Sequence, residues 1–126
     1  MTVKYSVVPK KDPRDLDAPP KYYPTVVSKE RSDLRDIANR ITQMSTVTSV
    51  DTMAVLEAFL LVIPEELAEG KIVELGELGS FRLTVLASGE DHPEDVSKRN
   101  IKEVKVRFKP GKLLKQILKG LEFRKV

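Results

Sequence analysis

The residues best suited to chemistry in this sequence are cations close to its C-terminal end. Lys105, Arg107 and Lys109 alternate with apolar residues, and Lys112 and Lys115 follow shortly afterwards. Alternation places residues two apart on one face of a β-strand, about 6 to 7 Å from each other, a spacing on the scale of adjacent phosphates in a nucleic-acid strand. The pattern indicates a cationic strand face that binds a polyanion. A solvated basic strand edge is the alternative.

The segment after this strand strengthens the case for an anion. Pro110 and Gly111 begin a predicted helix that has Lys112 in its first turn. A helix start offers free backbone N–H groups and the positive end of the helix dipole. A lysine placed there costs about 0.3–1 kcal/mol against the dipole. Lysines at this position are therefore easier to understand if a phosphate is bound beside them.

Composition argues against most catalytic and metal chemistry. The 126 residues include no Cys, so disulfides, thiolate metal sites and Cys nucleophiles are excluded, and the single His disfavours His-based metal sites. His92 follows Asp91 in a polar stretch, where neighbouring residues rarely hold the geometry of a catalytic pair. Gly76 and Gly79 fit neither glycine-rich phosphate-loop pattern. We expect a protein that is not an enzyme, with no metal, cofactor or small-molecule substrate.

Charge is unevenly distributed along the chain. In total, 22 Lys or Arg and 19 Asp or Glu give a net charge of +3. Residues 104–126 alone hold eight Lys or Arg against one Glu, and residues 1–31 are also basic, whereas 32–70 and 87–103 are acidic. Clustered cations raise the local potential where an even mixture would cancel it. The distribution therefore indicates an anionic partner.

The chain has the length of one domain and shows no targeting pattern. Nowhere do 18 uncharged apolar residues occur together, and no apolar run follows the N-terminal lysines. We therefore expect neither a membrane span nor an ordinary export signal. The absence of Cys agrees with a cytoplasmic location.

Residues 1–31 are expected to form a strand-loop-strand extension. Val3, Tyr5 and Val7 alternate with polar residues, as do residues 23–27 beyond a proline-containing loop. Such alternation is typical of strands, and proline confines these strands to sheet edges. A partly disordered arm is the alternative. The main domain is expected over residues 32–126.

Two helices are predicted next. Ser32 is a good N-cap for a helix that ends near Met44, and Ser49 for a second helix. Between residues 53 and 63 every residue except Glu57 is apolar. A helix that is apolar nearly all round must be buried on several sides, and a core of this size does not surround it from one chain. A partner subunit is therefore expected.

The second half of the chain changes to the period of β-strands. Gly76 and Gly79 enclose a predicted tight turn, and the polar stretch 87–100 separates the later strands. The predicted elements are strands at 72–75, 81–85 and 104–109 and a helix at 110–121. Helices and strands in this order predict an α+β fold.

The order of the elements, with two short motifs, resembles the bacterial histone-like HU/IHF DNA-binding family. Val73-Glu74-Leu75 and Gly79-Ser80-Phe81 resemble the hairpin signature of the family, and Phe108 to Lys112 resembles its C-terminal motif. The resemblance covers about residues 32–121. The extended front end and the ending Phe123 to Val126 resemble the HU-like branch of Bacteroidetes.

This resemblance implies a helical pair, a three-stranded antiparallel sheet with an arm and a C-terminal helix, in an intertwined homodimer whose saddle covers double-stranded DNA. The implied phosphate contacts come from the saddle and the last helix start, namely Arg82, Lys105, Arg107, Lys109, Gly111, Lys112 and Lys115. Pro93 stands near the proline that in the family inserts between base pairs and kinks the duplex.

The sequence thus predicts an architectural, largely non-sequence-specific DNA-binding protein of the cytoplasmic nucleoid. The arm of the family is basic, whereas four carboxylates flank Pro93 in this chain. The segment Pro93 to Ser97 alternatively starts a helical turn with proline at its first position. The alternative function is a protein-interaction or assembly module that keeps the HU scaffold with lost or reduced DNA bending.

Overall fold

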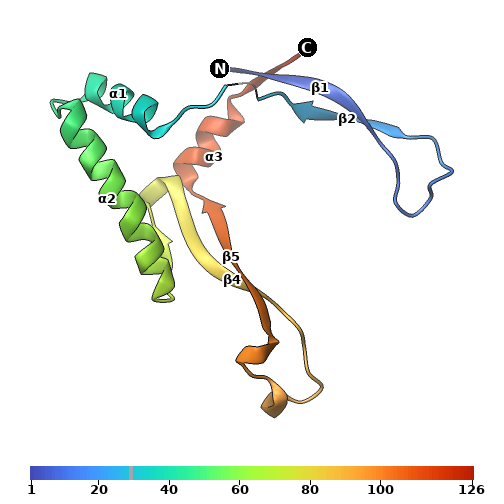
Figure 1. Ribbon diagram of the computed structural model, residues 1–126. Helices are drawn as coiled ribbons and strands as arrows, with labels where there is room; N and C mark the ends of the chain where they lie inside the picture. Colours follow the sequence, from blue (N-terminus) through green and yellow to red (C-terminus); the bar gives the residue numbers. More distant parts are fainter. Residues whose placement is uncertain (29) are drawn as a thin grey trace. The chain divides into compact units, whose positions relative to one another are not determined.

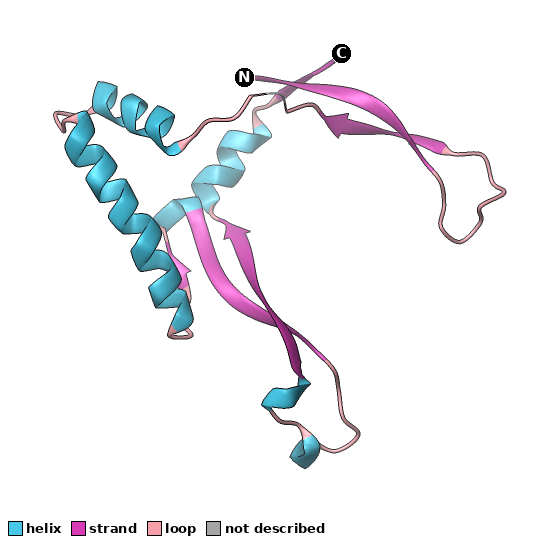
Figure 2. Ribbon diagram, in the orientation of Figure 1, coloured by secondary structure: helices cyan, strands magenta, loops and turns pink. Residues whose placement is uncertain are grey.

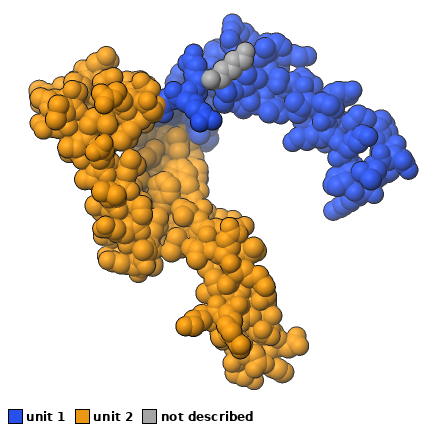
Figure 3. All heavy atoms as spheres, in the orientation of Figure 1, with its two compact units in different colours: residues 1–32, 117–126 blue, residues 33–116 orange. Residues whose placement is uncertain are grey.

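The computed structural model describes residues 1–28 and 30–126 and has an α+β fold (Figure 1, Figure 2). Contacts divide the chain into two compact units (Figure 3). Unit 1 contains residues 1–32 and 117–126, and unit 2 contains residues 33–116. Each unit has its own three-stranded sheet. In the part of the chain that is described, no helix is long and apolar enough to cross a membrane.

The sheet of unit 1 has the order β2-β1-β6. The strands β1 (Thr2–Lys10) and β2 (Lys21–Val26) are antiparallel and overlap the two stretches in which the sequence predicts strands. Strand β6 (Glu122–Lys125) was not expected and pairs in parallel with β1. Pro24 lies in the edge strand β2, as expected of a residue without an N–H, but β1, which contains Pro9, is the central strand, so the expectation that both strands lie at sheet edges is wrong for β1.

Helix α1 (Leu34–Met44) is capped by Asp33, and the expectation of Ser32 as N-cap is wrong by one residue. Asp33 Oδ1 accepts a hydrogen bond from the Asp36 N–H at 2.9 Å, and Asp36 Oδ2 accepts from the Asp33 N–H at 3.0 Å. This reciprocal capping box satisfies two donors at once. The hydrogen bond from the Asp36 amide also lowers the pKa of the Asp33 carboxyl, because it favours the charged form.

Helix α2 (Ser49–Ala68) is likewise capped one residue earlier than predicted. Thr48 Oγ1 accepts a hydrogen bond from the Asp51 N–H at 3.2 Å, whereas Ser49 is already helical. Pro64 lies inside the helix, which continues beyond it to Ala68. Gly70 follows with a φ of 81°, the left-handed conformation that commonly ends a helix.

The sheet of unit 2 has the order β3-β4-β5 with antiparallel pairing. A 3-10 turn at Gly76–Leu78 connects β3 (Val73–Glu74) to β4 (Gly79–Ala87). Strands β4 and β5 (Ile101–Pro110) form a long two-stranded ribbon (Figure 1). Helix α3 (Lys112–Lys119) follows Gly111.

A single chain buries few of its apolar side chains. Among the described residues, the buried apolar ones are Ala38 and Leu67. In α2, Val55 and Leu61 are 66% and 68% exposed, although a helix of this composition should be covered on several sides. The sheet of unit 2 exposes Val104 and Val106 in the same way. The chain's own fold therefore leaves a large apolar surface uncovered.

Close backbone packing holds the start of α3 against the turn before β4. The Gly111 N–H donates a hydrogen bond to the Leu78 carbonyl at 2.8 Å. A Cβ added at Gly111 would collide with the Glu77 carbonyl and lie 2.9 Å from the Gly79 nitrogen. Because these neighbours are backbone atoms, they have little freedom to move aside.

Gly111→Ala should therefore lower the free energy of unfolding by about 1–3 kcal/mol, the usual cost of overpacking. Gly89→Ala is the matched control, because a Cβ there meets nothing within 4 Å, and its effect should be neutral or slightly stabilising. Denaturant unfolding followed by circular dichroism measures both. Equal stability of the two variants would contradict the packing constraint.

Candidate functional site

The register of β4 and β5 gathers four of the predicted site residues on one face of the sheet. Arg82 lies directly opposite Arg107, and the partners of Lys105 and Lys109 are Thr84 and Ser80. Because residues paired across a ladder share a face, the four cations share one face. We call Arg82, Lys105, Arg107 and Lys109 the β4–β5 cationic face.

Glu103 of β5 and Glu74, which lies opposite Ser80, share this face, but in the described residues no salt bridge joins either of them to the four cations. The salt bridges of the described residues lie elsewhere, at the end of α2, and join Lys71 to Glu66 and Glu69 at 2.9 and 2.8 Å. These hydrogen bonds raise the pKa of Lys71. The direct opposition of Arg82 and Arg107 is unfavourable, since like charges facing each other across a ladder repel. The arrangement can bind an anion that bridges the cations.

The opposite face of the same strands is apolar. The rings of Phe81 and Phe108 lie on it with their centroids 4.9 Å apart, and Leu83, Val85 and Val106 continue it along the ribbon. All three aliphatic side chains are more than a third exposed. The sheet therefore separates a cationic face from an apolar one, as the alternation in the sequence predicts.

The start of α3 adjoins the cationic face through a shared hollow. A cavity of about 340 Å³ is lined by Arg82 and Lys109 of this face, by Gly111 just before α3, and by the acidic residue Glu74. The Gly111 N–H is already bonded to Leu78, so the free amides of the helix start are those that follow it. The side chains of Lys112 and Lys115 are exposed. Gly111 thus contributes close packing and no free donor to this site.

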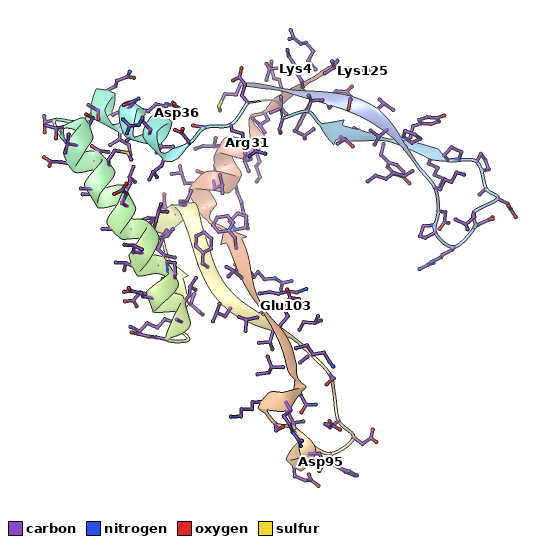
Figure 4. The ribbon with its side chains drawn as sticks, viewed as in Figure 1. Lys4, Arg31, Asp36, Asp95, Glu103 and Lys125 are labelled. Atoms are coloured by element: carbon purple, nitrogen blue, oxygen red, sulfur yellow. The ribbon has the colours of Figure 1, made fainter. Side chains whose placement is uncertain are left out.

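Pro93 is at the tip of the β4–β5 ribbon and not on its cationic face. It opens the 3-10 turn Pro93–Asp95, which agrees with the alternative that this segment starts a helical turn. Figure 2 shows two such short turns at the tip, and Figure 4 shows Asp95 there. His92 and the acidic residues of the tip are exposed. Within the described residues, no three His, Cys, Asp or Glu side chains group as a metal site.

Asn100 organises this tip and was missed by the sequence analysis. It is 6% exposed, and its Nδ2 donates to the Ser88 carbonyl at 3.1 Å and to Glu90 Oε1 at 3.0 Å. Its Oδ1 accepts the Ser97 N–H at 2.9 Å. The Ser-x-x-Asn spacing at residues 97–100 is the signal that could have found it, because this spacing suits a reciprocal cap.

Comparisons with known proteins show the family and a similar fold. A family model for HU-HIG, an HU domain fused to wHTH, Ig or glycine-rich motif, matches residues 1–125. The DNA-binding protein HU of Thermotoga maritima is 31% identical over 87 residues, which are 68% of this chain and 97% of that protein. A crystal structure from Bacteroides vulgatus, whose description proposes a bacterial DNA-binding protein, superposes with a TM-score of 0.70 at 15% identity. That similarity covers 99% of this chain and 48% of the other, so the chain spans about half the length of the Bacteroides protein.

The opposed arginines make a test of the register possible. Arg82→Glu should raise the free energy of unfolding by about 0.2–1 kcal/mol, because a cross-strand attraction to Arg107 replaces a repulsion. Arg82→Gln removes the repulsion without adding an attraction, so its free energy of unfolding should lie between those of the wild type and Arg82→Glu. Denaturant titrations at low salt measure the order of stabilities. A destabilised Arg82→Glu protein would mean that residues 82 and 107 do not face each other.

Proposed function

The chain belongs to the family of HU domains fused to wHTH, Ig or glycine-rich motifs, and from this premise we propose that it is an architectural protein of the nucleoid. It binds double-stranded DNA largely without regard to sequence. The observation that carries this proposal is the gathering of Arg82, Lys105, Arg107 and Lys109 on one sheet face with no carboxylate partner in the described residues.

Phosphate contact explains both the residue types and the low specificity. Lys and Arg on a sheet face meet the sugar-phosphate backbone, which is the same for every sequence, and they release its bound counterions. An anion between Arg82 and Arg107 would also relieve their repulsion. Lys112 and Lys115, with the free amides of the α3 start, extend the same contact to flanking phosphates. DNA is therefore bound chiefly through charge.

The bound form is proposed to be a homodimer. The apolar faces of α2 and of the β4–β5 ribbon have no cover within the described chain, and exposed apolar surface of this extent typically marks a protein interface. A second copy supplies an identical apolar surface, so a symmetric dimer buries both at once. Dimerisation also doubles the number of cationic faces available to one duplex.

DNA bending is proposed to be weaker than the family resemblance implies. Insertion of Pro93 between base pairs would bring Glu94 and Asp95 close to the phosphates, and the repulsion opposes it. Unstacking a base step costs a few kcal/mol, which must be offset by added contacts. The capped, acidic tip is also the observation that favours the second candidate function, an assembly module in which the tip contacts another protein.

A salt titration tests the proposal directly. Affinity for a labelled duplex should fall as salt rises, with log K against log salt giving a slope of about −4 to −5 if roughly four to six phosphates are neutralised. The variant K105E/R107E should lose most of this affinity and most of the slope, because two contacts become repulsive.

The matched control is R35E/R40E, which makes the same change in net charge on α1, away from the cationic face. It should keep nearly wild-type affinity. Failure of the wild-type protein to bind DNA even at low salt would falsify the function. Intact DNA binding by K105E/R107E, with loss of a protein partner, would favour the assembly module.

The dimer has its own test. The wild-type chain should scatter light as a dimer at micromolar concentration, and Leu61→Asp should dissociate or unfold it, because a carboxylate is then buried in an apolar interface. Leu16→Asp is the control, since Leu16 is 72% exposed against 68% for Leu61 but lies in the loop between β1 and β2. A folded wild-type monomer would contradict the proposed interface.

A further inference from the structure

Most of the net positive charge of this chain lies outside the unit that carries the proposed DNA-binding face. Residues 1–32 and 117–126, which form unit 1, hold ten Lys or Arg against five Asp or Glu. Unit 2 holds twelve against fourteen, although it contains the β4–β5 cationic face. The net charges are therefore +5 and −2. The proposed function does not account for the charge of unit 1.

The ladder of unit 1 places four of its cations on one face of the sheet. Lys4 lies directly opposite Arg124, and Lys10 directly opposite Lys21. Both pairs occupy even positions of β1, so all four side chains share one face. We call Lys4, Lys10, Lys21 and Arg124 the β1 cationic face. Figure 4 labels Lys4 at the N-terminal end of β1.

The other face of the same sheet is apolar and aromatic. Odd positions of β1 and their partners place Tyr5, Val7, Tyr22, Val26 and Phe123 there. These residues line a cavity of about 520 Å³. Of the five cations on the strands of unit 1, four thus share one face, together with Glu122 opposite Thr2, and Lys125 lies on the other face.

Each cation of the β1 cationic face repels its ladder partner. Like charges directly opposite each other destabilise a sheet, and in the described residues no carboxylate lies within salt-bridge distance of any of the four. The Lys10 Nζ instead lies 5.6 Å from the centre of the Tyr23 ring, on the same face. A polyanion that bridges both pairs would remove the repulsion.

The spacing of the pairs suits a duplex. Lys4 and Lys10 are six residues apart on β1, a separation of about 20 Å in an extended strand. Duplex DNA carries about 12 phosphate charges over that length. A row of cations in two repelling pairs, on a face of this length, matches a nucleic-acid backbone better than a small anion.

We infer that the β1 cationic face is a second binding surface for the phosphate backbone of DNA. It is formed by residues of unit 1 alone and adds to the β4–β5 cationic face. The inference rests on the proposed function, because it assigns more of the same duplex contact to residues that the proposed saddle does not include. Unit 1 thereby becomes a DNA-binding element.

Site-specific cross-linking tests which face of the unit 1 sheet lies against DNA. Thr25 and Val26 are adjacent exposed residues of β2 whose side chains lie on opposite faces, Thr25 on the cationic face and Val26 on the apolar face. The chain has no Cys, so T25C and V26C each accept one photo-cross-linker uniquely. In the full chain bound to a labelled duplex, the T25C conjugate should cross-link to DNA several-fold more than the V26C conjugate.

Charge reversal tests whether this surface contributes to DNA affinity and to its salt dependence. The variant K4E/K21E leaves each new carboxylate opposite a cation, Arg124 or Lys10, so the sheet should be at least as stable as the wild type while its face becomes neutral. The slope of log K against log salt should become less negative than that of the wild type, by about 0.9 for each phosphate contact that is lost. The control K125E/R14E changes the net charge by the same amount. It leaves the β1 cationic face intact, because Lys125 faces the apolar side and Arg14 lies in the loop between β1 and β2.

The outcomes separate the two proposals. Wild-type DNA binding together with equal or absent cross-linking at T25C and V26C overturns this inference alone, as does a control that changes the slope as much as K4E/K21E. A wild-type chain that binds no DNA overturns the proposed function, and this inference with it. Selective cross-linking from T25C with a reduced slope for K4E/K21E supports both.

Discussion

The antiparallel register of β4 and β5 is the constraint on which the rest of the structure depends. With Arg82 opposite Arg107, four cations, Arg82, Lys105, Arg107 and Lys109, fall on one face and Phe81 and Phe108 on the other. A slip of one residue would reverse every side chain of one strand and mix charge with apolar surface. The contact of Gly111 with the turn at Glu77 fixes one end of this ladder, because only a residue without a side chain fits there.

The same alternation underlies the proposal of a second subunit. Because the cations of β4 and β5 share one face, the apolar side chains of these strands lie on the opposite face. Helix α2 adds further apolar surface that the described chain does not cover. A monomer with so little buried apolar area has a weak hydrophobic driving force for folding. Folding and dimerisation are therefore proposed to be coupled, so that changes in the apolar faces affect stability and assembly together.

Short-range patterns could be predicted from the sequence, and long-range pairing could not. Alternation located both long strands of unit 2 and placed Lys105, Arg107 and Lys109 on one face. Arg82 joined them only through the family resemblance, because a sequence does not state which residues face each other across a ladder. The helix caps were wrong by one residue, since Ser32 and Asp33, or Thr48 and Ser49, are all competent caps and tertiary geometry selects between them. Strand β6 was missed because four residues carry too little periodicity, and its pairing with β1 joins the two ends of the chain.

The placement of charge argues for a protein that holds DNA more than it deforms it. Both cationic faces lie on paired strands, where the ladder fixes their spacing, whereas the far end of the ribbon carries carboxylates and a tip closed by Asn100. In the proposed complex, the cations of the sheet faces contact the phosphates of a duplex that is not kinked. These contacts provide no free energy to offset the unstacking of bases at the tip. An acidic tip also repels the duplex from the one segment able to insert, which directs it towards the cationic faces. In the proposed mode of binding, any sequence preference comes from how easily the DNA adapts its shape to those faces, and not from hydrogen bonds to base edges.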